Sequence, residues 1–203
     1  MFLVNEILVF SPGRRQEALD RLSYIHGLMA PQEGFVNAIV AKYLGDLTRH
    51  TVLRFWQDEA AYQKFREGPD GNYGRNRPQG LYTNEQVIPQ WNSFSVDGDI
   101  AGGGNYLAKV HQPVPEDGWA GFQQMQGQIS AVAKSAGMKS AAHFRAKDRS
   151  EALTVARFGG RQDLEKMFES PDFAKIAGPR MAEGATPPKV ECFEIVTEVG
   201  PKG

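Results

Sequence analysis

Cysteine is almost absent from this chain, and so is any excess of one charge. The 203 residues contain a single cysteine, Cys192, which excludes an internal disulfide framework and a zinc site built on several cysteines. The 23 Lys and Arg residues are balanced by 24 Asp and Glu residues. Proteins that bind nucleic acids or acidic membrane surfaces usually carry a basic stripe. We therefore expect no nucleic acid and no membrane among the partners.

Long apolar runs are missing as well. No uninterrupted stretch approaches the roughly 20 residues of a membrane-spanning helix. The apolar N-terminus, residues 2–10, is interrupted by Asn5 and Glu6 and has no leading basic residue, so it does not resemble a signal peptide. With 41% hydrophobic and 23% charged residues, the composition is typical of a folded globular protein. We expect a soluble, cytoplasmic protein.

Familiar catalytic and metal-binding motifs are also missing from the sequence. There is no GxSxG turn, no phosphate-binding glycine loop and no Ser-His-Asp arrangement. The four histidines, His26, His50, His111 and His143, are not spaced like metal ligands. The sequence therefore predicts no metal site.

The chain does contain an internal repeat. After a shift of 103 residues, Gly34 falls on Gly137, the run Thr51–Phe55 falls on Thr154–Phe158, and Phe65 falls on Phe168. Because these matches keep their order and spacing, we interpret them as a duplication. The predicted domains are residues 1–100 and 105–203, joined by a linker rich in glycine and aspartate.

Hydrophobic periodicity predicts the same order of elements in both halves. In residues 14–29, for example, Ala18, Leu22, Ile25 and Met29 share one helix face. Strands are expected at 2–10, 35–43, 50–56, 86–96, 106–111, 140–146, 152–158 and 190–199. Helices are expected at 14–29, 59–65, 115–133 and 162–168, with Asp58 as the N-cap of the second. Each half thus has the βαββαβ order of a ferredoxin-like unit.

The strand at 35–43 carries apolar residues on both of its faces. One face must pack on the helices, and the other needs a cover that the second half provides. The prediction is an α+β fold in which two tandem ferredoxin-like repeats form an intramolecular α/β barrel. The whole would be a pseudo-dimer, present as a monomer or as a homodimer.

Three stretches of the first half resemble the antibiotic biosynthesis monooxygenase family of the dimeric α/β-barrel superfamily. They are Val4–Ile7, Gln32–Phe35 and Arg54–Ala60, the last with a W-x-D-E-A pattern. The resemblance covers residues 2–70, and more weakly 105–175. It implies a fold in which two such units form a barrel, and activities that include cofactor-independent oxygenation of quinone precursors and haem degradation.

The resemblance also suggests which residues act. It places the family's active-site asparagine at Asn5, where a carboxamide would donate to a substrate oxygen. Haem-degrading members use a Trp late in the second helix and a nearby His. Here Phe65 stands at the Trp position and residues 70–75 contain no histidine. The expectation is therefore no cofactor, with haem disfavoured.

Each candidate functional residue also has a purely structural interpretation. Asn5 and His143 are the predicted catalytic residues, with a hydrogen-bonded core side chain as the structural alternative for each. His143 and Arg145 share a strand face that we expect to look into the space between the sheets. The predicted substrate-binding residues, which are also ordinary core residues, are Trp56, Phe65, Tyr73, Trp91 and His111.

The function that follows is a cofactor-independent monooxygenase acting on a small aromatic molecule of the quinol type. Such a substrate reduces dioxygen itself, while the protein orients it and stabilises its anion. The alternative is a small-molecule-binding or stress-response protein of the same fold without catalysis. A haem-binding or haem-degrading protein ranks third, because no axial histidine stands in the expected place.

Overall fold

The computed structural model describes residues 1–100, 102–182 and 186–202. The chain divides into two compact units: Met1–Asn92 with Phe193–Gly203, and Ser93–Cys192. We call these unit 1 and unit 2. The division differs from the predicted halves because the last strand ends in unit 1, where it pairs with an edge strand of that unit. The pairing satisfies backbone groups that an open sheet edge would leave exposed.

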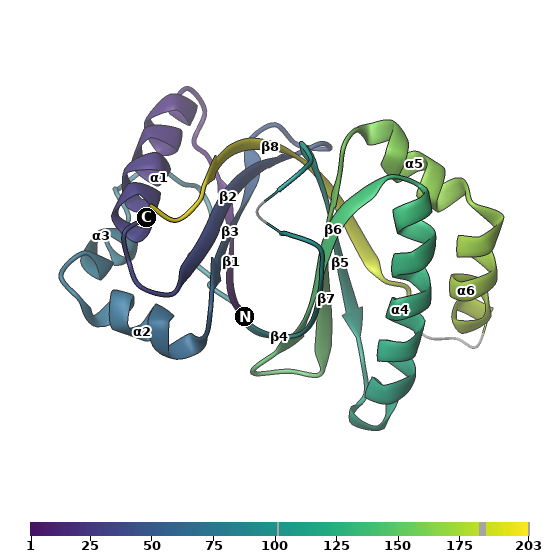
Figure 1. The fold of residues 1–203 in the computed structure, drawn as a ribbon. Helices are drawn as coiled ribbons and strands as arrows, with labels where there is room; N and C mark the ends of the chain where they lie inside the picture. The colour runs from purple at the N-terminus through teal and green to yellow at the C-terminus, as the bar shows by residue number, and fades with distance from the viewer. Residues whose placement is uncertain (101, 183–185, 203) are drawn as a thin grey trace. The chain divides into compact units, whose positions relative to one another are not determined.

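Unit 1 has the predicted elements and one more helix (Figure 1). They are β1 (Phe2–Val9), α1 (Arg15–Met29), β2 (Phe35–Tyr43), β3 (Arg49–Trp56), α2 (Glu59–Glu67), the additional α3 (Gly71–Arg75) and the start of β4 (Gln90–Asp97). Asp58 caps α2 by accepting a hydrogen bond from the backbone N–H of Ala61, as its position before the helix predicts. β3 lies between β1 and β2, antiparallel to both.

Unit 2 repeats this plan with a longer helical layer. Its elements are β5 (Tyr106–Pro113), η1 (Glu116–Gly118), α4 (Trp119–Ser135), β6 (Met138–Ala146), β7 (Glu151–Phe158), α5 (Arg161–Glu169), α6 (Pro171–Ala182) and the start of β8 (Lys189–Val199). β7 pairs with both β5 and β6. Helix α6 is not among the predicted elements.

The hydrogen-bonded strands follow the closed order β1-β3-β2-β8-β5-β7-β6-β4. This confirms the predicted fold class: an α+β chain of two tandem ferredoxin-like repeats with an intramolecular barrel. Strand β2 is buried on both faces, as predicted, since Ala38, Ile39, Val40 and Ala41 have no exposed surface. Within the described residues, every helix is too short or too polar to cross a membrane.

The pairing of the strands shows that the two repeats align differently from the sequence prediction at the third strand of each repeat and the helix that follows it. Phe2 pairs with Trp56 in unit 1, and Tyr106 pairs with Phe158 in unit 2. The structural counterpart of Trp56 is therefore Phe158, one residue earlier than the 103-residue shift predicts. The same offset carries through the following helix, so Met167 in place of Phe168 corresponds to Phe65.

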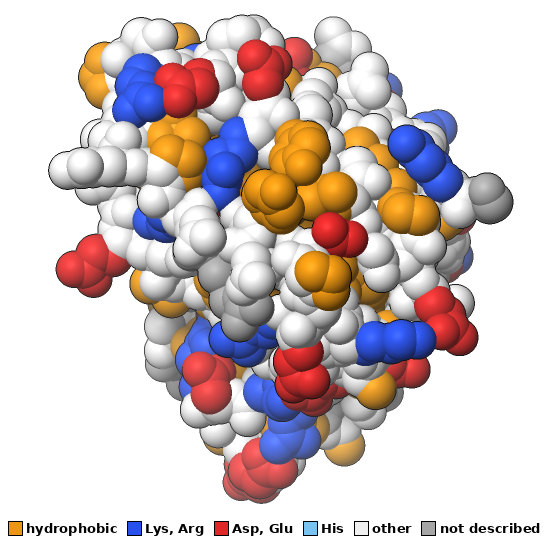
Figure 2. Space-filling model, turned by 90° about the vertical axis from the view of Figure 1, so that its left-hand side faces the viewer, with side chains coloured by type: hydrophobic (Ala, Val, Ile, Leu, Met, Phe, Trp, Pro, Cys, Tyr) orange, Lys and Arg blue, Asp and Glu red, His pale blue; other side chains and the backbone are white. Residues whose placement is uncertain are grey.

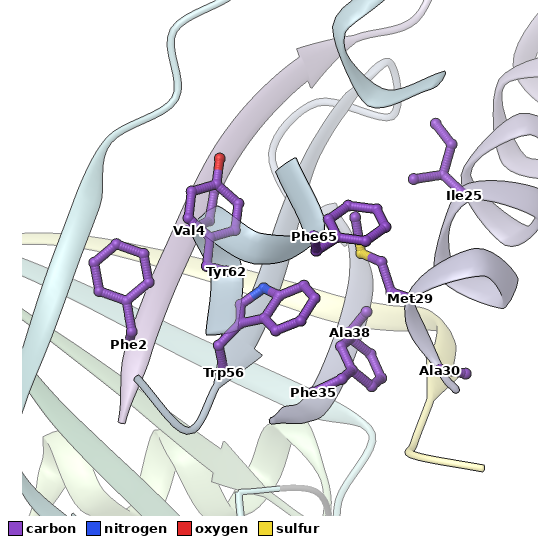
Figure 3. Packing of buried hydrophobic residues seen from close by; sticks show 10 residues of the cluster. All are labelled: Phe2, Val4, Ile25, Met29, Ala30, Phe35, Ala38, Trp56, Tyr62 and Phe65. Carbon is purple, nitrogen blue, oxygen red and sulfur yellow. The ribbon is translucent and has the colours of Figure 1, made fainter. Parts of the chain in front are cut away.

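The core of unit 1 lies between its helices and one face of its sheet. Trp56 packs edge-on against Phe35, at 5.4 Å between ring centroids, and beside Phe65, also at 5.4 Å. Figure 3 shows these rings together with Tyr62, while Met29 and Ile25 approach from α1. The outer face of this unit's helices mixes positive and negative side chains with small apolar patches (Figure 2).

Candidate functional site

An apolar cavity of about 280 Å³ lies in unit 2, between the sheet and its helices. Strands β5, β6 and β7 form the floor, while α4, α5, α6 and residues 186–190 form the walls. Its lining is mostly aliphatic and aromatic: Ala108, Val110, Met125, Ile129, Ala133, Met138, Ala141, Ala156, Phe158, Met167, Phe168, Phe173, Ala177, Pro187, Pro188 and Val190. Its size is at the lower end of the range for small-molecule pockets.

Small side chains create this space. Ala156 pairs with Ala108 and Ala141 on the two sides of β7, and all three line the cavity. At the equivalent place of unit 1, β3 carries Arg54, and Trp56 and Phe65 fill the volume farther along the strand. The apolar cavity therefore belongs to unit 2, whereas the sequence resemblance favours a pocket in the first half.

One part of the cavity lining is polar and uncharged. The ring of His143 shares hydrogen bonds with two hydroxyl groups: Nδ1 lies 2.9 Å from Thr154 Oγ1, and Nε2 lies 3.3 Å from Ser130 Oγ. A neutral imidazole donates from one nitrogen and accepts at the other. One of the two hydroxyls therefore accepts from the ring and keeps its own O–H available. Gln112 and Gln126 add carboxamides to the lining.

Burial lowers the pKa of His143 from its usual 6.5 to about 4, although the nearby carboxylate of Asp97 acts in the opposite direction. The imidazole is therefore neutral at pH 7, and Phe94 stacks at 6.0 Å from its ring. A negative charge arising beside the ring would favour its protonated form and raise its pKa again. Proton transfer to His143 therefore requires that the anion stay beside the ring.

A second cavity, of about 520 Å³, lies next to the first and shares three lining residues with it. Gln126, Ser130 and His143 line both cavities, so they form the wall between them. The second cavity is more polar, and Asp97 and Lys134 form an ion pair of 2.7 Å on its lining. His143 therefore faces the helices of unit 2. The expectation that it looks into the space between the sheets is wrong.

Asn5 lies on the other face of its sheet from the aromatic cluster of Trp56 and Phe65. Side chains alternate along a strand, and in β1 Val4 belongs to that cluster. Asn5 is buried, and its Oδ1 accepts a hydrogen bond of 3.0 Å from Thr51 Oγ1. The structure separates the predicted donor from the predicted pocket walls, and the hydrogen bond fits the structural alternative.

The predicted aromatic residues of the first half do not surround one pocket. Trp56 and Phe65 are packed in the core of unit 1 (Figure 3). Tyr73, on α3, is 46% exposed and stands edge-on to Tyr24 on α1. Trp91 is fully buried in β4 and pairs with Leu3, which places it on the opposite sheet face from Trp56.

His111 does not share the cavity with His143. Its neighbours Val110 and Gln112 line the cavity, so the alternation of β5 turns His111 to the other face. There Nδ1 lies 2.7 Å from Glu151 Oε1. Its pKa is lowered, chiefly by burial and also by Lys109. His111, predicted to bind substrate, therefore lies outside the lining of this cavity.

Sequence reasoning missed Ser130 and Thr154, and it missed the α6 wall. The available signal was the apolar face of α4, where Gln126 occurs between apolar positions and Ser130 follows one turn later. A buried polar residue on such a face needs a partner. For Ser130 that partner is His143, which lies beside Thr154 across β6 and β7, and the helix pattern alone does not identify it.

Comparison with known proteins gives a family for the first part of the chain and a fold for all of it. Residues 1–70 match the family model described as "Antibiotic biosynthesis monooxygenase". A search of curated protein sequences finds no match.

Solved structures similar to this chain cover nearly its whole length. A candidate monooxygenase from Fusobacterium nucleatum has a TM-score of 0.82 at 10% identity, covering 100% of this chain and 95% of its own. A candidate monooxygenase from Lactobacillus acidophilus has a TM-score of 0.78 at 10% identity, covering 98% and 95%. An anthrone oxidase-like protein has a TM-score of 0.68 at 14% identity, covering 98% and 92%. At such identities the likeness shows the fold alone.

Proposed function

We propose, from the premise that residues 1–70 form an antibiotic biosynthesis monooxygenase domain, that this protein is a cofactor-independent monooxygenase. Its substrate would be a small, electron-rich aromatic molecule of the quinol type. The reaction would take place in the cavity of unit 2, even though the family match lies in the other repeat.

The observation that carries the proposal is the combination of an apolar cavity with one neutral hydrogen-bonding centre. A flat aromatic molecule would bury its rings against the aliphatic walls. Its hydroxyl or enol oxygen would meet Ser130, Thr154 and His143, the polar groups that would otherwise remain in apolar surroundings. The position of these groups supports their assignment as the orienting centre in place of Asn5.

The chemistry needs no group other than substrate and dioxygen. His143 accepts the phenolic or enolic proton, and the resulting electron-rich anion transfers electrons to dioxygen. When a ring CH₂ becomes a carbonyl, the carbon gives up four electrons. One oxygen atom of dioxygen enters the carbonyl and the other leaves as water with the two hydrogen atoms. The protein would exclude water and stabilise the anion by hydrogen bonds.

A metal or haem is not required for this reaction. Within the parts of the chain that the structure describes, no three or more His, Cys, Asp or Glu side chains group to hold a metal ion. Both ring nitrogens of His143 already share hydrogen bonds with hydroxyls, so axial ligation of haem iron would break one of them. This supports the proposal that haem is not the cofactor.

Oxygen consumption with anthrone as the probe tests the proposal. We expect turnover with one dioxygen consumed per anthraquinone formed. His143→Ala should reduce kcat/KM by about 100-fold, in the range of lost acid–base catalysis. Ser130→Ala should reduce kcat/KM by about tenfold, corresponding to one lost hydrogen bond. Ser135→Ala, at the exposed end of the same helix, is the matched control and should leave activity unchanged.

Two results would contradict the proposal. Saturable anthrone binding without oxygen uptake would favour a non-catalytic binding protein of the same fold. A saturable Soret shift at one equivalent of haemin, lost in His143→Ala, would favour a haem protein instead.

A further inference from the structure

Unit 1 contains a second polar centre that the proposed oxygenase reaction does not use. A small opening of about 20 Å³ lies between α1, β1, β3 and residues 77–86. The polar side chains that line it are Glu6, Arg21, Arg54, Arg77, Tyr82 and Gln86. Three guanidinium groups therefore face one carboxylate, which leaves an excess of positive charge.

The one carboxylate in this lining is already engaged. Glu6 Oε2 accepts from Arg54 Nη1 at 3.1 Å, and Glu6 Oε1 accepts from Gln86 Nε2 at 3.1 Å. Both the Glu6 and Arg54 side chains are less than a tenth exposed. The ion pair is thus a buried part of the unit, and Glu6 does not neutralise the charges of the other two arginines.

Several guanidinium donors around the opening have no acceptor within the part of the chain that the structure describes. Arg77 donates from Nη1 to the backbone oxygen of Asn84 at 2.7 Å, and its guanidinium stacks over Tyr82. Among the described residues, its Nε and Nη2 are buried without a partner, and so is Nε of Arg54. Unsatisfied guanidinium donors in a buried place carry a substantial free-energy cost.

His26, on α1, shows the effect of the positive charge of Arg54 on a neighbouring element. Its side chain has no exposed surface, and neither ring nitrogen has a hydrogen-bond partner among residues 1–100, 102–182 and 186–202. Its pKa is lowered far below 6.5, mainly by burial and also by the positive charge of Arg54. The positive charge of Arg54 thus acts on His26, a residue of the helix that borders the opening.

We infer that this centre, formed by Arg54 and Arg77, binds a compact monovalent anion of halide or formate size. The anion supplies the acceptors that the two guanidinium groups lack, and its charge offsets their excess. The volume exceeds that of a single water position but leaves no space for a bulky ligand. A carboxylate at the tip of a larger molecule would present the same chemistry.

The site belongs to unit 1 alone. In unit 2 the counterparts of Glu6 and Arg54 are Val110 and Ala156, as the matching ladders show. The two repeats thus differ in the same layer: one has an apolar cavity, and the other has a charged centre. Binding of the anion and oxidation of an aromatic substrate are separate properties, and either can fail without the other.

Urea unfolding of the full chain at constant ionic strength tests the inference. Sodium formate, sodium chloride and sodium benzoate are each titrated against sodium methanesulfonate, whose tetrahedral sulfonate group is too bulky to enter and which carries no carboxylate. A ligand that binds only the folded state stabilises it saturably. We expect a saturable rise in the unfolding midpoint with formate or chloride. A rise with benzoate as well would identify the carboxylate of a larger ligand as an occupant.

Arg77→Gln should weaken the apparent anion affinity at least tenfold, because it removes the charge and the unpartnered donors. Arg66→Gln, an exposed arginine on α2, is the matched control and should retain the effect. Arg77 is only half-buried, so we expect the Arg77→Gln variant to fold. Equal, non-saturating midpoint shifts in formate and methanesulfonate would overturn the inference, as would an unchanged formate response in Arg77→Gln.

Discussion

At the scale of single residues, Gly34 shows how backbone conformation and packing together restrict a position. Its φ is +79°, and a Cβ there would lie 2.5 Å from the Cβ of Ala61. Gly137 occupies the matching place before β6, with φ of +109° and a Cβ contact of 2.9 Å to Asp163. The entry to the second strand of each repeat therefore requires glycine for two reasons.

Gly34→Ala should lower the free energy of unfolding by about 2–4 kcal/mol, since left-handed strain adds to the steric overlap. Gly13→Ala is the matched control, because Gly13 has φ of +77° but no atom within 4 Å of its Cβ position. It should cost only about 1 kcal/mol, from strain alone. Urea unfolding of both variants measures the difference. Equal losses would show that the contact with Ala61 relaxes freely.

Residue positions in the sequence predicted some contacts and not others. The shared spacing of Gly34 and Gly137 was visible as part of the repeat. That His143 and Arg145 share a strand face was also predicted, and both reach helical-layer residues, Ser130 and Trp119. Which of the two faces they occupy depends on the phase of the strand, and for a sheet with both faces apolar the pattern does not fix that phase.

At the scale of elements, helix α6 forms one wall of the cavity, although the amino-acid composition of this segment disfavours a helix. Residues 171–182 begin with proline and contain a Gly-Pro pair at 178–179, which lowers intrinsic helix propensity. Phe173 and Ala177 nevertheless line the cavity from this helix, so packing outweighs propensity. The other long helices were predicted correctly because their apolar faces are regular, as in α1.

Ala177→Phe should fill part of the cavity and weaken the binding of an apolar ligand at least tenfold. Ala174→Phe is the matched control, because Ala174 is exposed on the same helix and does not line the cavity. Titration with an environment-sensitive apolar dye measures both affinities. If the two variants bind the dye equally, the dye and the proposed substrate site are not in this cavity.

At the scale of the whole molecule, the two repeats keep one fold while their polar groups have moved. Glu6 and Arg54 of the first repeat correspond to the apolar Val110 and Ala156 of the second. Conversely, His143 and Thr154 of the second repeat correspond to the apolar Val40 and Val52 of the first. The repeat and the fold were therefore predictable from apolar spacing. The site was not, because a family resemblance in residues 1–70 says nothing about which repeat retains an open cavity.

Burial of the histidines makes the free energy of unfolding of the whole chain depend on pH. The pKa values of His26, His50, His111 and His143 are all lowered, in each case chiefly by burial. In the unfolded chain these groups bind protons near pH 6.5, whereas the folded chain resists protonation. The unfolded state therefore binds more protons below this pH, and the free energy of unfolding falls as the pH decreases.

We expect the free energy of unfolding to fall between pH 7.5 and pH 5, a range above the titration of the carboxylates whose pKa values are lowered, such as Glu151. His143→Gln should reduce that fall by about 2 kcal/mol, because the imidazole titrates near 6.5 when unfolded and at about 4 when folded. Ser135→Ala should retain the full slope. Urea unfolding at both pH values gives the comparison, and an unchanged slope in His143→Gln would mean that this ring is protonated in the folded protein at pH 5.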